Sequence, residues 1–117
     1  MAVALAVMAG PAVAQSEIAK ACAFMQECFE AEGCTETDYT PALTWQVGAD
    51  ELLVEAQFDS PSETITLIGV ASDGALSLAG GSFAARHLLT VAADGAARYT
   101  VHYADGPMVI SYLGVCR

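Results

Sequence analysis

Residues 85–116, ARHLLTVAADGAARYTVHYADGPMVISYLGVC, decide the fold, because apolar and polar side chains alternate along them and two Asp-Gly pairs interrupt them. Alternation with a period of two is typical of a β-strand with one buried face. Each Asp-Gly pair favours a two-residue hairpin turn, in which both central residues adopt positive φ. The stretch therefore predicts three antiparallel strands joined by two tight turns. The predicted strands cover 85–92, 96–103 and 107–115.

The two turns fix which side chains share a face of the sheet. A two-residue turn at Asp105-Gly106 places Tyr103 opposite Met108 and Tyr99 opposite Tyr112. One face is then apolar, and we expect it to form the core. Its members are Leu88, Tyr99, Val101, Tyr103, Met108, Ile110, Tyr112 and Cys116. The opposite, polar face carries His87, Arg98, Thr100, His102 and Ser111.

The same reasoning at Asp94-Gly95 places the two histidines of the chain, His87 and His102, opposite each other. Cβ atoms of such a pair lie about 4.5 to 5.5 Å apart, so two imidazoles can share a transition metal. A metal needs more than two ligands, and the same-face neighbours Thr100 and Ser111 are poor ones. Two interpretations stay open, a weak metal or pH-sensitive site and a polar pair on a solvated face. A four-residue loop would remove the pairing.

Earlier segments continue the pattern of short strands. Residues 51–58 alternate, with one apolar face formed by Leu52, Val54, Ala56 and Phe58. Segments 63–70 and 75–79 flank a third Asp-Gly pair, whose register gives an inward face of Ile65, Leu67, Ala71, Leu76 and Leu78. Turn residues every 8 to 12 positions or so indicate an antiparallel barrel or sandwich. We expect an all-β domain of about seven strands over residues 42–117.

Residues 15–41 form an acidic, cysteine-rich segment that we expect to pack on this domain. Ile18, Cys22, Met25 and Phe29 recur at helical spacing, whereas Cys22 and Phe24 alternate as on a strand. Because the local pattern supports both, we predict an irregular or mixed conformation.

Residues 1–14 are expected to be a cleaved signal peptide. An apolar run, AVALAVMA over residues 2–9, precedes a small-residue motif that ends at Ala14, although no Lys or Arg comes before it. A retained cytosolic apolar tail is the alternative. Export leads us to expect a periplasmic or secreted protein.

Four cysteines in a short exported chain favour two disulfides over metal ligation. Their spacing does not match the paired knuckles of zinc sites. Of the three possible connectivities we favour Cys22 with Cys116, which joins the first ordered segment to the last, and Cys28 with Cys34, which closes a short acidic loop.

Fourteen acidic residues against four basic ones give a formal net charge of −10. This balance argues against binding to nucleic acid and to anionic membranes. Glu27, Glu30 and Glu32 form a dense acidic loop beside Cys28 and Cys34. We consider it a solvated loop or a docking surface for a basic partner, and it lacks the ligand spacing of a calcium loop.

Known catalytic motifs are missing from the sequence, including GxSxG, HExxH and phosphate-binding glycine loops. We therefore expect neither an enzyme nor a cofactor. The aromatic residues Tyr39 and Trp45 suit core packing better than a binding patch. The expected function is non-catalytic, namely a binding or structural module for an envelope partner.

Two short motifs carry a resemblance to known proteins. Cys22-x-Phe24-x-x-Glu27-Cys28 near the start and Tyr112-Leu113-Gly114-x-Cys116 at the end resemble small exported proteins of alphaproteobacteria without an assigned activity. The size, acidity and disulfides are also similar to those of the periplasmic inhibitors of C-type lysozymes, but their inhibitory loop motif is missing here. That likeness implies inhibition of a basic enzyme as an alternative function.

Overall fold

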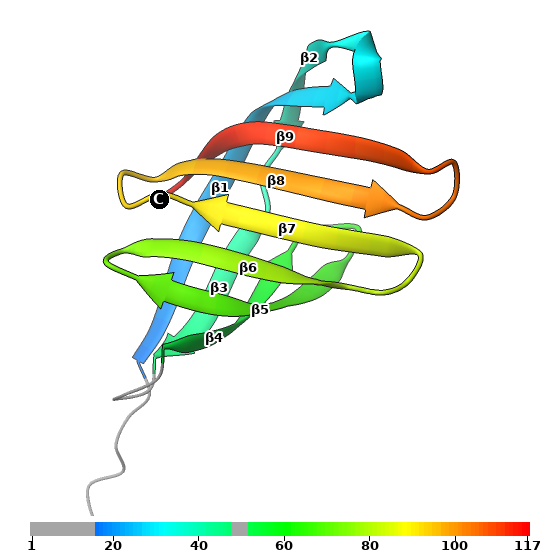
Figure 1. Cartoon of the computed structure of the whole chain (residues 1–117). Helices are drawn as coiled ribbons and strands as arrows, with labels where there is room; N and C mark the ends of the chain where they lie inside the picture. Colours follow the sequence, from blue (N-terminus) through cyan, green and yellow to red (C-terminus); the bar gives the residue numbers. More distant parts are fainter. Residues whose placement is uncertain (1–15, 48–51) are drawn as a thin grey trace, which may run out of the picture.

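The computed structural model describes residues 16–47 and 52–117, and it is an antiparallel all-β structure (Figure 1). The predicted signal peptide, residues 1–14, lies outside the described residues. Nine strands and one short 3₁₀ helix, η1 (Glu30–Glu32), are present in the described part. The strands are β1 (Ser16–Phe29), β2 (Cys34–Tyr39), β3 (Ala42–Val47), β4 (Leu53–Asp59), β5 (Thr64–Ser72), β6 (Ala75–Gly81), β7 (Ala85–Val91), β8 (Ala96–Tyr103) and β9 (Met108–Cys116).

The strands close into a barrel, which confirms the predicted fold class. Strands β3 to β9 pair with their neighbours in sequence order, and β1 pairs with both β3 and β9. Strand β2 is the extra strand outside this ring. It pairs with residues 24–28 of β1. This is the same edge of β1 that pairs with β3 over residues 16–21. In Figure 1, β2 and the end of β1 project beyond β9.

The irregular or mixed conformation predicted for residues 15–41 is wrong for most of the segment. β1 is a 14-residue strand, and β2 follows η1 almost directly. The physical reason is tertiary, because β1 has a hydrogen-bonding partner on each edge and local spacing does not reveal such partners. A bulge between Phe24 and Gln26 shifts the alternation, so Glu27 faces the same side as Phe24.

Both favoured disulfides are present. Cys22 and Cys116 are opposite each other in the ladder between β1 and β9. Their bond therefore links the first and last strands, whose pairing closes the barrel. Cys28 and Cys34 are opposite each other between β1 and β2, across η1. The described residues hold no free cysteine.

The core fills the middle of the barrel with inward side chains from every barrel strand. Phe24, Phe58 and Tyr99 lie at its centre, with ring centroids 5.0 to 6.4 Å apart. Trp45 is also buried, in agreement with the expected core role. The predicted inward residues Val54, Ala56 and Phe58 are buried, but Leu52 is exposed and precedes β4. Burial of each large side chain contributes roughly 1.5 to 3 kcal/mol.

Two of the three predicted hairpin registers are confirmed. Asp73 and Gly74 both have positive φ, as a two-residue turn requires, and Ala71 lies opposite Leu76. The last hairpin has a longer connection over residues 104–107, but it is symmetric about Asp105-Gly106. Tyr103 therefore still lies opposite Met108.

The register predicted for the hairpin at Asp94-Gly95 is wrong by one residue. Ala92 donates its backbone N–H to the carbonyl of Ala96, which leaves a three-residue loop whose last residue, Gly95, has a φ of +97°. A three-residue loop of this kind ends in a left-handed residue, for which glycine is suited. A slip of one residue moves every side chain of a strand to the other face. Leu88 is consequently 46% exposed on the outside, and His87 faces inward.

Candidate functional site: the cleft between β3 and β4

The predicted histidine pair does not form. His87 lies opposite Val101, and His102 lies opposite Arg86 on the outer face. Because the two rings are on different sides of the barrel wall, they cannot share a metal ion. In the described part of the chain, no group of three or more His, Cys, Asp and Glu side chains is arranged to hold one. The metal-site interpretation is thus corrected.

His87 instead joins a cluster of tyrosines at the end of the barrel nearest the β6–β7 connection. Its Nδ1 lies 2.6 Å from the hydroxyl of Tyr99, whose ring packs on Tyr39 and Tyr112. Burial lowers the pKa of His87 and raises the pKa of Tyr99. Burial thus favours the neutral form of both groups.

The three acidic residues of the predicted partner-binding loop have different surroundings. Glu27 lies beside Tyr112, and burial together with this carboxylate raises the pKa of Tyr112 to about 12. Glu30 accepts a 2.7 Å hydrogen bond from the backbone N–H of Val109, which attaches η1 to β9. Glu32 is exposed. Glu27 and Glu30 thus have partners within the protein, and docking of a basic partner at this loop stays a prediction.

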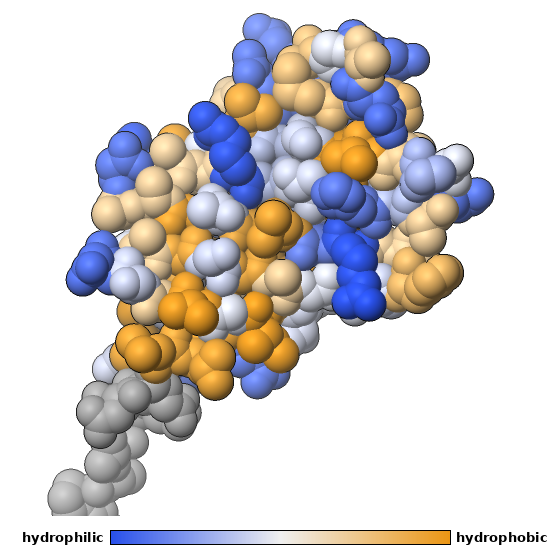
Figure 2. Space-filling view, in the orientation of Figure 1, coloured by the Kyte–Doolittle hydropathy of each residue, from blue (hydrophilic) through white to orange (hydrophobic). Residues whose placement is uncertain are grey.

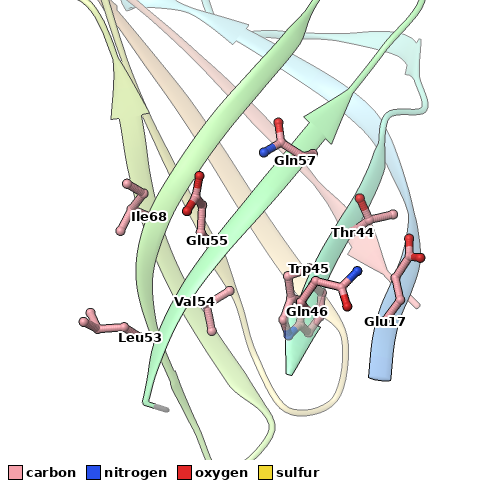
Figure 3. A pocket seen from close by; sticks show the side chains of 9 residues that line it. All are labelled: Glu17, Thr44, Trp45, Gln46, Leu53, Val54, Glu55, Gln57 and Ile68. Atoms are coloured by element: carbon pink, nitrogen blue, oxygen red, sulfur yellow. The ribbon is translucent and has the colours of Figure 1, made fainter. Parts of the chain in front are cut away.

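A cleft of about 500 Å³ opens on the outer surface between β3 and β4 (Figure 3). The ladder between these strands ends at Trp45 and Ala56. β3 continues to Val47 beside β1, and β4 begins at Leu53 beside β5. The two strands separate over this interval, and the cleft occupies the space between them. Its lining residues are Glu17, Thr44, Trp45, Gln46, Leu53, Val54, Glu55, Gln57 and Ile68.

The polar lining of the cleft is acidic and rich in hydrogen-bonding groups. Glu17 on β1 and Glu55 on β4 stand on opposite sides in Figure 3, with the side chains of Thr44, Gln46 and Gln57 around them. None of the nine lining residues is basic. Two carboxylates without a neighbouring base attract a positively charged group, and amide and hydroxyl groups can bind a peptide backbone.

Apolar side chains border the cleft on the β4–β5 side. Leu53 lies opposite Val70, and Ile68 is next on the same outer face; all three are exposed. Figure 2 shows apolar side chains gathered at the end of the molecule where β4 and β5 lie. Contiguous apolar surface beside a polar groove is typical of an interaction site.

The polar groups that line the cleft are two carboxylates, two amides and one threonine hydroxyl, all of which can form hydrogen bonds with a ligand. Sequence reasoning did not find this site, although the predicted alternation placed Glu55 and Gln57 on one outer face. The sequence did not indicate that the β3–β4 ladder ends at Trp45 and Ala56. The cleft, whose lining includes Glu17 and Gln46, lies beyond this point.

No family model, no curated protein and no solved structure matches this chain. Within residues 16–47 and 52–117, the structure has no helix that is long and apolar enough to span a membrane. The two disulfides fit an oxidising, extracytoplasmic compartment.

Proposed function

We propose that this protein is a non-catalytic binding module of the bacterial envelope, which holds an extended, positively charged segment of a partner protein in the β3–β4 cleft. One observation carries the proposal: Glu17 and Glu55 face the same cleft, and none of the described residues that line it is basic. The expected export to the periplasm or beyond would bring the module to such a partner.

Charge alone gives such a complex little affinity. Exposed ion pairs contribute about 0 to 1 kcal/mol each, so two carboxylates supply selectivity and a faster encounter more than strength. Apolar contacts with Leu53 and Ile68 are expected to add affinity. A partner segment that alternates basic and apolar residues matches both sets of groups.

The separated strand edges offer a second source of affinity. Beyond Trp45 and Ala56, β3 and β4 pair only with their outer neighbours in the described ladders. An extended peptide binds such an edge through main-chain hydrogen bonds, while its side chains give specificity. The proposed complex therefore combines backbone pairing with recognition of charge.

The proposal is tested by titration with a blocked hexapeptide of alternating Arg and Val, monitored by the fluorescence of Trp45. This residue is the chain's single tryptophan and it lines the cleft. We expect saturable binding that weakens when salt is raised from 50 to 500 mM. The double variant Glu17→Gln/Glu55→Gln should bind about tenfold more weakly, because two ion pairs are lost.

Glu32→Gln is the matched control, since it removes an exposed carboxylate at the opposite end of the molecule. It should bind the peptide as the wild type does. Unchanged affinity in the double variant would exclude the cleft as the binding site. Loss of binding in Glu32→Gln alone would place the site at the acidic loop. A hexapeptide of alternating Glu and Val should not bind.

Inhibition of a basic enzyme such as lysozyme is the narrower form of the same proposal. It is supported by the acidic cleft and is measured by lysis of cell walls in the presence of the protein. Inhibition that is lost in Glu17→Gln/Glu55→Gln would identify the enzyme as the partner. Absence of inhibition would leave a basic, non-enzymatic envelope protein as the expected partner.

A further inference from the structure

The barrel has a second, chemically different pocket at the end opposite η1. It has a volume of about 420 Å³ and lies between the start of β1, the end of β3 and the β5–β6 hairpin. The lining residues are Ile18, Lys20, Trp45, Val47, Ala71, Gly74, Ala75 and Leu76. Trp45 also lines the outer cleft, so one indole lies between the two hollows.

The described residues that line this pocket are apolar except for one. Lys20 is the only charged residue among them, and it alternates with Ile18 and Cys22 on the inward side of β1. It is half-buried, opposite the fully buried Leu43 of β3. A lysine in this position packs its hydrocarbon stem on apolar neighbours and directs its ammonium group toward water.

The position of Lys20 is unusual for this composition. It is the only lysine in a chain with fourteen acidic residues, and it is on an inward face. The basic residues Arg86 and Arg98 are exposed on the outer surface. An apolar side chain would fill the same inward position without the cost of partly burying a charge. A ligand of opposite charge would pair with the ammonium group at this position.

We propose that this pocket binds an amphipathic anion, with its hydrocarbon chain among the apolar side chains and its anionic head group against the ammonium of Lys20. Small-molecule sites have volumes of about 300 to 1,000 Å³, are mostly apolar with few polar groups, and often lie in the mouths of β-barrels. The pocket meets all three conditions. This inference does not rest on the proposed function of the cleft, because the cleft is proposed to bind a positively charged segment and this pocket an anion.

Length of the hydrocarbon chain should control affinity. Each buried methylene contributes about 0.8 kcal/mol, which corresponds to about fourfold tighter binding. Affinity should therefore rise in steps along a series of carboxylates and level off when the pocket is full. Among ligands of equal chain length, the charge of the head group should then determine the affinity.

The experiment compares three ligands that share a ten-carbon chain: decanoate, decanol and decyltrimethylammonium. Binding is measured below the micelle concentration by the fluorescence of Trp45 and by calorimetry. Decanoate should bind at a single saturable site, decanol about tenfold more weakly, and decyltrimethylammonium more weakly still. Lys20→Met should weaken decanoate about tenfold and leave decanol unchanged.

Arg86→Met is the matched control, because it removes the same charge from the outer surface near the opposite end of the barrel. It should bind decanoate as the wild type does. Ala71→Leu places extra volume in the pocket and should weaken both decanoate and decanol. Thermal melting and circular dichroism of each variant show whether the barrel is intact.

Three results would overturn the proposal. They are the absence of saturable decanoate binding to the wild type, binding of decyltrimethylammonium as tight as that of decanoate, and equal losses in Lys20→Met and Arg86→Met. A folded Ala71→Leu protein with undiminished binding would also exclude this pocket as the site. Loss of decanoate binding in Lys20→Met alone, with decanol retained, would support it.

Discussion

At the scale of single residues, His87 shows how a one-residue change of register alters chemistry. On the outer face it would be a solvated, titrating side chain beside His102. On the inner face its Nδ1 is 2.6 Å from the Tyr99 hydroxyl, and burial lowers its pKa, although the carboxylate of Glu63 opposes this in part. The imidazole is therefore part of the packing inside the barrel, where it stacks on the ring of Tyr99.

The lowered pKa of His87 predicts how stability depends on pH. The unfolded chain binds the proton more tightly than the folded protein does, because an unperturbed histidine has a pKa near 6.5. The free energy of unfolding should thus fall as the pH drops below about 6.5 toward the folded-state pKa. We expect urea unfolding to show a smaller loss between pH 7 and pH 5 in His87→Gln than in the wild type.

His102→Gln is the control for this measurement, since His102 is exposed on the outer face. Its loss of stability between the two pH values should equal that of the wild type. If His87→Gln retained the full wild-type loss, the inward placement of His87 would not be responsible for it.

At the scale of elements, the three Asp-Gly hairpins show what determines strand register. The segments VASDGA at 70–75 and VAADGA at 91–96 differ at one position, yet their loops have two and three residues. In the second, Asp94 also accepts a 3.0 Å hydrogen bond from the backbone N–H of Ala96. Turn sequence alone therefore restricts the loop to a few lengths, and packing of the flanking strands selects among them.

Leu88 and Leu89 provide a direct test of this register. Leu89 is fully buried and Leu88 is on the outside. Leu89→Ala should lower the free energy of unfolding by about 2 to 5 kcal/mol, whereas Leu88→Ala should change it by about 0.5 kcal/mol or less. Urea unfolding of both variants measures the difference, and a larger loss for Leu88→Ala would restore the register predicted from a two-residue turn.

The pattern of the sequence was most informative where one face of a strand is buried. It gave the boundaries of β5 to β9 within two residues and the inward faces of four of them, because period-two alternation reports burial directly. It failed for β1, whose apolar spacing suits a helix and a strand equally. It also could not reveal the cleft, because the lining residues come from strands that are distant in sequence, such as β1 with Glu17 and β4 with Glu55.

At the scale of the whole molecule, closure of the barrel depends on the contact between its first and last strands. β1 pairs with β9 from Cys22 to Phe29, and Cys22 is bonded to Cys116 at one end of that ladder. Because the paired residues are 94 positions apart, closure is entropically costly for the unfolded chain. The disulfide lowers that cost by restricting the unfolded state.

The two disulfides should therefore differ in their effect on stability. Removal of the Cys22–Cys116 bond by a double change to Ser should cost about 4 to 5 kcal/mol, and removal of Cys28–Cys34, which spans 6 positions, about 2 kcal/mol. Urea unfolding of each double variant gives the two values. Equal losses would mean that loop entropy does not govern the contribution of the long bond.

The bond between Cys22 and Cys116 also has a mechanical consequence. When the molecule is stretched between a handle attached before Cys22 and one attached after Cys116, tension passes through the sulfur atoms and bypasses the enclosed chain. The covalent ring then cannot be extended by the applied force, so the oxidised barrel resists pulling along this path even when its ladders are weak. Under a reductant the same pull would act directly on the ladder between β1 and β9.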